Sequence, residues 1–380
     1  MKISRSTKSS IDNSRGKFWI LSSTFFLVNI AVVFSVKVPK FLFLTNPVTF
    51  WGTAFLLTTS TFAQPAPHLT RFTFQRGLFG TQFVATLYAT DSITAQRAYT
   101  AVSARMDSLN QVMSDYLDGS EINRLSETAG QNRFVPVSPT LFDVLTKAKT
   151  IAQTSGGRFD FTIGPLSQLW RRAVRRGEFP TARQRRTARR SVGYQFVELD
   201  SISQSVRLRR PGMKLDLGGI GQGYAVDVAQ TVLHRHGIRA FLLDLGGDVL
   251  AGDAPPNQER GWRILIGENN KQPVNQLDTL TIFLRNAAIT TSGDTYRFLE
   301  HRGKRYSHVM NPRSGLGLRH GVRTTVLAPD GTRADALTKV FSVAGIRNSQ
   351  RLLRRFPGAE LHTMENRNGM MRIWQSHNFD

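Results

Sequence analysis

The sequence predicts a single α+β domain whose sheet is mixed or antiparallel. Apolar residues recur at helical spacing in several longer stretches, and shorter apolar or alternating runs typical of strands lie between them. The two kinds do not follow each other in regular strand–helix–strand order, which argues against a doubly wound parallel sheet. The hydrophobic content of 40% is normal for a globular chain.

Each expected element has a local signal. The first is a hairpin over residues 72–88 with a turn at Gly77–Gly80. A helical apolar stripe covers residues 94–113, and a polar loop is expected over 114–123. The other expected helices are 140–154, 334–344 and 348–355, and the other expected strands are 196–199, 205–208, 241–245, 263–266, 279–284 and 324–327.

The segment from Lys214 to Asp227 is the most informative, because it places glycine at positions 218, 219, 221 and 223. Its apolar lead-in, Met213 to Leu217, predicts a strand, and the apolar spacing from Tyr224 to Leu233 predicts a helix. Glycines between them are expected to turn the chain sharply and to allow a close approach. Such a strand–turn–helix could hold a phosphate, and taken alone it fits a glycine-rich structural turn equally well.

Positive charge is concentrated along the chain. The formal net charge is +23, and residues 171–190 contain nine arginines and one acid. Known single-strand binders place aromatic residues among the basic ones, and Phe179 is the only aromatic residue in this tract. We therefore favour a solvated basic helix or loop inserted into an enzyme over an RNA-binding arm. Contact with anionic lipid is a third interpretation. The chain has no cysteine, which excludes disulfides, thiolate catalysis and cysteine–zinc sites.

Residues 1–63 are predicted to be a targeting segment rather than part of the fold. Two interpretations remain open: a membrane anchor over 18–36, and a signal peptide that begins near Lys37 and ends in small residues at Ala63. We favour the signal peptide, and expect a periplasmic or cell-envelope protein, with anchoring to the inner membrane as the alternative. The remaining expected boundaries are a linker at 64–71, a domain at 72–360 and a tail at 361–380.

Three side chains stand where chemistry is feasible. His308 lies between an expected strand and an Asn-Pro turn, and a histidine can deprotonate a hydroxyl near neutral pH. Asp216 directly precedes the glycines and could cap a turn. Asp335 opens an expected helix and could cap it or bind a hard cation, with Thr338 on the same face. Taken alone, both carboxylates favour a structural role.

A second pair of glycines is flanked by acids in Asp244-Leu-Gly-Gly-Asp248. It could form another ligand-facing loop or a tight hairpin, and we favour the hairpin.

Together and in this order, these segments resemble the ApbE family of FAD:protein FMN transferases. The resemblance extends from about Phe72 to Leu353. The matching segments are Gly80-Thr81, Met113–Tyr116, Ser120–Ile122, Phe159–Leu166, Leu169-Trp170, Val192–Tyr194, Leu215–Asp227, Thr291–Asp294, Tyr306–His308 and Asp335–Leu337.

The resemblance implies a T-fold-like domain that transfers FMN from FAD to a threonine or serine hydroxyl of a target protein and releases AMP. It also implies Mg²⁺ at the pyrophosphate, where the ion neutralises charge. The implied partners are FAD and an acceptor protein.

The resemblance also assigns residues to roles. His308 matches the catalytic base that activates the acceptor hydroxyl. Tyr116 is expected to pack on the isoalloxazine ring. The FAD-contacting positions are Phe79, Tyr116, Arg158, Phe159, Asp160, Asp216, Gln222 and Val309, and the metal-ligand positions are Gly219, Asp335 and Thr338.

This chain departs from the family pattern at three of its positions. Phe79 replaces a usual methionine, and Gln222 replaces a common lysine or glutamate. Lys339 occupies the place of the usual metal-binding threonine, so either Thr338 supplies the oxygen or the Lys339 ammonium partly replaces the charge of the ion. Two other functions stay open: an FAD pyrophosphatase, and a flavin-binding or nucleic-acid-binding protein without catalysis.

Overall fold

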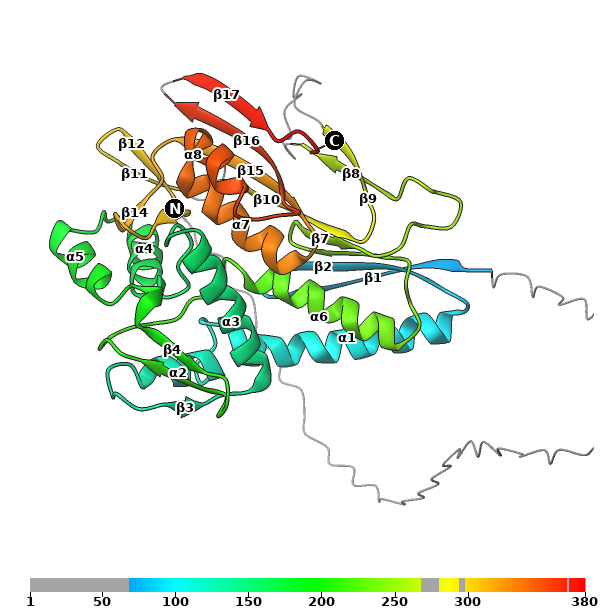
Figure 1. The fold of residues 1–380 in the computed structure, drawn as a ribbon, viewed down its shortest axis with the longest axis horizontal. Coiled ribbons are helices and arrows are strands. Elements are labelled where there is room, and N and C mark those ends of the chain that lie inside the picture. Colours follow the sequence, from blue (N-terminus) through cyan, green and yellow to red (C-terminus); the bar gives the residue numbers. More distant parts are fainter. Residues whose placement is uncertain (1–67, 268–279, 294–297, 368, 380) are drawn as a thin grey trace, which may run out of the picture. The chain divides into compact units, whose positions relative to one another are not determined.

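The computed structural model describes residues 68–267, 280–293, 298–367 and 369–379 (Figure 1). The chain divides into two units, Met1–Gln64 and Pro65–Asp380. The expected targeting segment, including the apolar stretch at 18–36, lies outside the described residues. Within the described part of the chain, no helix is both long and apolar enough to cross a membrane.

One antiparallel sheet organises the domain, which confirms the predicted α+β fold. Its strand order is β1-β2-β6-β7-β10-β15-β16-β17, and every neighbouring pair is antiparallel. The strands are β1 (Thr70–Leu78), β2 (Thr81–Ala89), β6 (Phe241–Leu245), β7 (Asp248–Ala251), β10 (Ala287–Gly293), β15 (Gly321–Ala328), β16 (Glu360–Arg367) and β17 (Met370–Gln375).

The sheet extends beyond both expected domain boundaries. β1 begins at Thr70, inside the expected linker at 64–71. Residues 361–380, expected as a tail, supply most of β16 and all of β17. In β16, buried Leu361, Thr363 and Glu365 alternate with less buried neighbours, as a strand with one face on a core requires. The tail prediction was therefore wrong.

Helices cover one face of this sheet. In Figure 1, α6 lies between α1 and α7, and α7 packs against β10 and β15. The four longest helices of the described chain are α1 (Ser92–Met113), α3 (Pro139–Thr154), α6 (Gly221–Arg235) and α7 (Gly331–Ala344), and the shorter α8 (Ile346–Leu353) follows α7. The main core joins helix residues such as Met106 to sheet residues such as Leu87 and Ala288. Ile289, on the other face of β10, packs in a smaller apolar cluster under the β8–β9 hairpin (Trp262–Ile266 and Leu280–Leu284).

The remaining elements frame the site. They are α2 (Glu121–Glu127), α4 (Gly164–Arg176), α5 (Ala182–Arg190), a short 3₁₀ turn (Tyr194–Phe196), β3 (Val135–Pro136), β4 (Val197–Asp200), β5 (Ser205–Leu208), β11 (Phe298–His301), β12 (Lys304–Ser307), β13 (Met310–Asn311) and β14 (Leu316–Gly317). The polar loop expected over 114–123 ends earlier, because Ser120 caps α2 by accepting from the Asn123 N–H. The arginine tract forms the end of α4 and the whole of α5, and no residue of α5 is buried.

Candidate active site

The glycine segment differs from its prediction. The lead-in from Met213 to Leu217 is not a strand; its one bridge in the described structure joins Lys214 to Ile163. Met213, Leu215 and Leu217 are nevertheless buried in the main core, so the alternation reflects packing of an extended segment rather than pairing in a sheet.

The four glycines do not form a left-handed turn, since none of them has a positive φ. Gly221 and Gly223 belong to the first turn of α6. The prediction of a close approach is confirmed at Gly223, where an added Cβ would lie 2.0 Å from the carbonyl oxygen of Gly331. The group approached is the backbone of α7.

Asp335 lies inside α7 and is fully buried. The helix is capped by Asp330, whose side chain accepts from the Arg333 N–H, so the capping interpretation of Asp335 was wrong. One carboxylate oxygen of Asp335 accepts from the Gly223 N–H at 3.2 Å, and the other pairs with the Lys339 ammonium. These contacts join the first turn of α6 to α7.

Lys339 lies among the predicted metal-ligand positions. A Cβ added to Gly219 would meet the Lys339 Cγ at 3.5 Å and the Phe159 ring at 3.4 Å. Burial lowers the pKa of Lys339, but the carboxylates of Asp335 and Asp248 outweigh this effect and raise it overall. The site thus brings together Gly219, Phe159 and Asp335 with a fixed ammonium group.

Thr338 is buried beside this cluster, but its hydroxyl is engaged elsewhere. It donates to the backbone carbonyl of Asp335 at 2.7 Å. Among the described residues, no group of three or more acidic or histidine side chains could hold a metal ion. The Asp335 carboxylate, the charged member of the three predicted ligands, is instead paired with the Lys339 ammonium and the Gly223 N–H.

Asp248 is a buried acid in the segment for which the sequence favoured a hairpin over a ligand-facing loop. The hairpin interpretation of its segment is confirmed, because β6 and β7 pair around Gly246–Gly247. Asp248 accepts from the Thr290 hydroxyl at 2.8 Å. Burial, followed by the nearby Asp335 carboxylate, raises its pKa to about 8. An acid placed directly after paired glycines at the start of a buried strand was the available signal.

Asp216 organises a second cluster. Its carboxylate accepts from the Gly218 N–H at 2.9 Å, from the Ser167 hydroxyl and from the Arg171 guanidinium at 2.8 Å. Arg171 also pairs with Asp115 at 2.7 Å. Sequence reasoning missed Arg171 because it stands in a run of exposed arginines.

Tyr116 is the exposed member of this second cluster. Its side chain is 74% exposed, and the Arg171 guanidinium lies 4.1 Å from the ring centroid. One face of an accessible ring is therefore supported by a cation. Burial, followed by the nearby Asp216 carboxylate, raises the pKa of Asp115.

The Arg158–Asp160 segment is held by its own polar groups. The Asp160 carboxylate accepts from the Thr162 N–H at 2.9 Å and from the Tyr194 N–H at 3.1 Å, and burial raises its pKa. Arg158 donates to the Ser155 carbonyl at 2.8 Å; burial, then the charge of Arg313, lowers its pKa. Asp160 thus shapes the loop that carries Phe159.

His308 lies on an exposed bend between β12 and β13. The residues on both sides of it are fixed: the Ser307 N–H donates to the Leu318 carbonyl at 2.8 Å, and the Leu318 N–H donates to the Val309 carbonyl at 2.9 Å. Val309 is buried against Leu318. The backbone on both sides of the exposed His308 is therefore held in place, and the role of His308 as a site residue stays a prediction.

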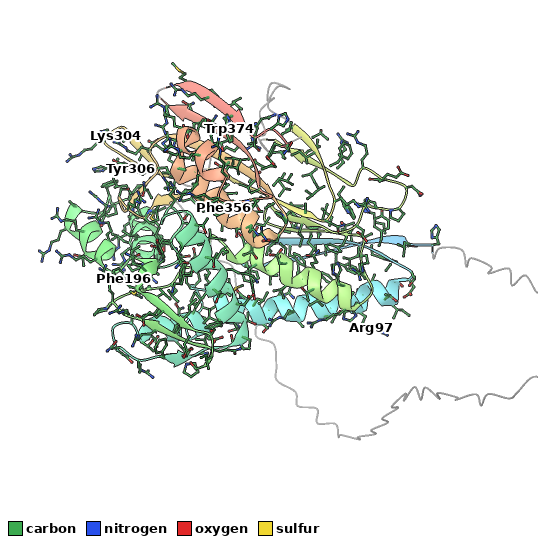
Figure 2. All side chains as sticks on the ribbon, in the orientation of Figure 1. Arg97, Phe196, Lys304, Tyr306, Phe356 and Trp374 are labelled. Atoms are coloured by element: carbon green, nitrogen blue, oxygen red, sulfur yellow. The ribbon has the colours of Figure 1, made fainter. Side chains whose placement is uncertain are left out.

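α4 connects the histidine loop to the acid clusters. The Trp170 indole donates to the Gly315 carbonyl at 3.0 Å in the turn between β13 and β14, and its neighbour Arg171 reaches Asp216. Phe179 stacks on His301 at 4.2 Å and packs on Tyr306, so the arginine tract is anchored to the β11–β12 hairpin. Figure 2 labels Tyr306 on this hairpin.

A family model described as the ApbE family matches residues 79–362. The chain belongs to the ApbE family. An FAD:protein FMN transferase of Treponema pallidum is 30% identical over 260 residues, which cover 66% of this chain and 72% of that protein. One from Salmonella typhimurium is 27% identical over 307 residues, covering 79% and 86%.

Solved structures of the ApbE family share the fold. The apo flavinyl transferase ApbE of Pseudomonas stutzeri has a TM-score of 0.73 at 25% identity and covers 82% of this chain and 96% of its own. The flavin transferase ApbE of Vibrio cholerae has a TM-score of 0.70 at 22% identity and covers 82% and 99%.

The two remaining positions predicted from the ApbE pattern lie at element ends. Phe79 occupies the β1–β2 turn with φ 49°, and the Gly246 N–H from the β6–β7 turn donates to Gln82 nearby at 3.1 Å. Gln222 lies half-buried in the first turn of α6.

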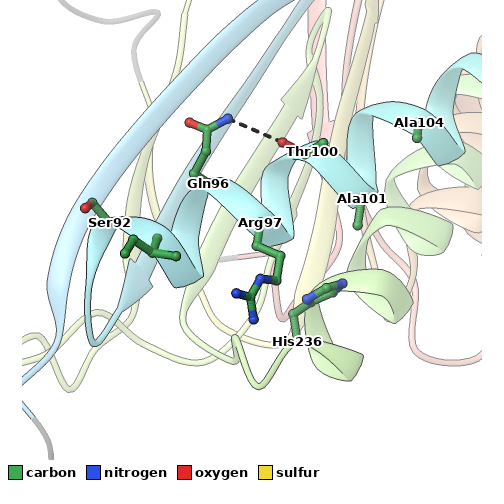
Figure 3. Close-up of a pocket in the computed structure, with 8 residues that line it drawn as sticks. Ser92, Gln96, Arg97, Thr100, Ala101, Ala104 and His236 are labelled. Carbon is green, nitrogen blue, oxygen red and sulfur yellow. Dashed lines mark hydrogen bonds between the residues drawn. The ribbon is translucent and has the colours of Figure 1, made fainter. Parts of the chain in front are cut away.

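A surface hollow of about 760 Å³ lies elsewhere, between α1 and the end of α6 (Figure 3). Arg97 and His236 line it, and it includes none of the predicted ApbE site residues.

Proposed function

We propose that this chain transfers FMN from FAD to a hydroxyl group of a target protein. The observation that carries the proposal is the ApbE-family match over residues 79–362, which includes a histidine held on both sides by backbone hydrogen bonds. The FAD:protein FMN transferases named above, of which this chain covers 72% and 86%, support it.

The proposed reaction is a phosphoryl transfer. The acceptor oxygen forms a bond to the phosphorus on the FMN side of FAD, and the bond from that phosphorus to the bridging oxygen breaks. AMP leaves with the bridging oxygen, while the hydroxyl proton passes to the His308 imidazole. A histidine suits this role because its ordinary pKa lies near neutral pH. A threonine or serine is the acceptor that supplies such a hydroxyl.

FAD binding is assigned to the groups around the glycine segment. Tyr116 offers an accessible ring backed by Arg171 and can stack on the isoalloxazine. Phe159 lies beside Gly219, and the Asp216 carboxylate accepts from three donors. Asp216 therefore acts by shaping the site, since three of the about four lone-pair sites of its carboxylate already have partners.

Mg²⁺ is implied by the family, but the residues here fit it poorly. The Asp335 carboxylate, the one charged ligand among the predicted positions, is already shared by the Gly223 N–H and by the Lys339 ammonium, whose positive charge would repel the ion. We therefore derive no step through the ion.

We also propose that the enzyme works outside the cytoplasm. The two apolar runs within residues 1–63 support export. An envelope protein is then the proposed acceptor.

The test is His308→Ala in the full chain, with FAD and envelope proteins as acceptors. Loss of a general base lowers rates by about 10²–10⁴-fold, so covalent flavin detected by mass spectrometry should fall by that factor while FAD binding persists. His236→Ala, away from the site, is the matched control and should keep transfer. Unchanged transfer in His308→Ala would remove the His308 side chain from the mechanism. If the unaltered chain releases free FMN and AMP and forms no protein adduct, it is a pyrophosphatase instead.

A further inference from the structure

Lys339 lies where a cation would be expected. Its stem passes Gly219, with Cγ 3.5 Å and Cε 3.7 Å from the position of an added Cβ, and its ammonium pairs with Asp335. Both neighbours are predicted metal-ligand positions. The Lys339 side chain thus pairs with Asp335 and passes beside Gly219, the two positions predicted to hold a divalent ion.

The charges of the cluster favour this arrangement. The Asp335 side chain is 1% exposed, and a buried carboxylate without a partner is costly. Asp248, which is buried and electrostatically coupled to Asp335, adds a second acidic group. A lysine four residues after Asp335 on α7 lies on the same helix face and can reach its carboxylate.

The Lys339 side chain is partly exposed. It keeps 27% of its surface exposed, while its partner Asp335 is enclosed. The side chain therefore lies at the edge of the buried cluster, from which its charge can act on the phosphates of a nucleotide.

We propose that Lys339 is a built-in cation that replaces a bound divalent ion at the nucleotide site of this chain. The lysine neutralises the buried carboxylate of Asp335 and offers positive charge to the FAD pyrophosphate. The residue at position 339 thus supplies positive charge itself instead of coordinating a metal ion. This inference rests on the proposed function for the identity of the nucleotide, whereas the exclusion of the divalent ion does not depend on it.

The experiment measures Mn²⁺ binding to the full chain by electron paramagnetic resonance, with and without FAD. Lys339→Thr removes the charge and restores a hydroxyl, and Lys339→Met removes the charge while keeping an apolar stem. We expect Lys339→Thr to bind Mn²⁺ at least about tenfold more tightly than the unaltered chain, because a like charge beside the site is gone. Lys304→Met, an exposed lysine on the β11–β12 hairpin, is the matched control and should change nothing.

Two results would overturn the proposal: Mn²⁺ binding to the unaltered chain as tight as to Lys339→Thr, or no gain in either Lys339 variant. If both variants fail to fold in thermal unfolding, the unaltered chain decides, since tight Mn²⁺ binding to it would contradict the proposal and its absence would agree.

Flavin transfer is then measured with a chelator present. Transfer by the unaltered chain should persist, whereas transfer by Lys339→Thr should require added Mg²⁺. A chain that transfers nothing under any condition contradicts the proposed function and leaves the Mn²⁺ result standing.

Discussion

Gly223 and Gly331 meet backbone to backbone where α6 packs on α7. A Cβ on Gly223 would lie 2.0 Å from the Gly331 carbonyl oxygen, and a Cβ on Gly331 would lie 2.5 Å from the Gly223 carbonyl oxygen. This contact also brings the Gly223 N–H to Asp335 at 3.2 Å. The glycines thus serve a helix–helix contact that sets the floor of the site.

Gly223→Ala should destabilise the domain. The clash is with backbone rather than with a flexible side chain, so the helices must separate, and overpacking of this kind costs about 1–3 kcal/mol or more. Gly221→Ala is the matched control, because its added Cβ would meet only the Leu217 Cβ, at 3.9 Å. Urea unfolding of both variants checks this, and equal midpoints would show that the two helices can move apart freely.

Arg171→Gln should weaken both folding and FAD binding. It leaves the buried carboxylates of Asp115 and Asp216 without their shared cation and removes the support of the Tyr116 ring. Breaking a buried pair costs about 3–5 kcal/mol, and because the Arg171 side chain is 28% exposed we expect about 2–3 kcal/mol.

The neighbouring Arg172→Gln is the control for that experiment, since Arg172 is exposed on the same turn of α4. Its free energy of unfolding should change by less than about 0.5 kcal/mol. Unfolding curves and FAD titrations measure the two effects separately. Similar behaviour of the two variants would contradict the bridging role of Arg171.

Asp227 gives the stability a pH dependence. Its carboxylate accepts from the N–H groups of Gly331 at 2.6 Å and Thr332 at 2.9 Å, yet burial raises its pKa to about 6. Between pH 4 and pH 6 the folded state holds a proton that the unfolded state has released. The stability from this proton is fully present below about pH 4 and is lost as the pH rises through 6.

Asp227→Asn should therefore remove a downward slope between pH 4 and pH 6. Asp227 is not fully enclosed, which reduces the size of the effect. Between pH 4 and pH 6 we expect the difference in free energy of unfolding between Asp227→Asn and the unaltered chain to change by on the order of 1–2 kcal/mol. Urea unfolding at pH 4, 5, 6 and 7 measures it, with the exposed Asp118→Asn as control. Parallel curves for the unaltered chain and Asp227→Asn would exclude this source.

Local patterns predicted much of the fold. The β1–β2 hairpin, the strand before His308 and the long helix α1 were confirmed, because their signals lie within a few neighbouring residues. β16 was missed as part of the domain because it follows a helix late in the chain, and only its pairing with β15 makes it part of the sheet. The Met213–Leu217 lead-in shows the converse error, in which buried alternation exists without a strand.

The candidate site was predicted only in part, because sequence signals are local and many contacts of the site are not. The sequence alone determined the family resemblance, the fold class and the candidates His308, Asp216 and Asp335, which depend on residue type and local order. It also indicated that Thr338 shares a helix face with Asp335.

Only the tertiary structure decided what these residues contact. Arg171 joins Asp216 across 45 residues of sequence, and Gly219 meets Lys339 from another element. Such contacts depend on how α4, α6 and α7 pack, because a side chain's partner is set by distance in space rather than along the chain. The Asp335–Lys339 pair is a local contact within α7, whereas packing decided that Gly219 and the Gly223 N–H lie beside this pair.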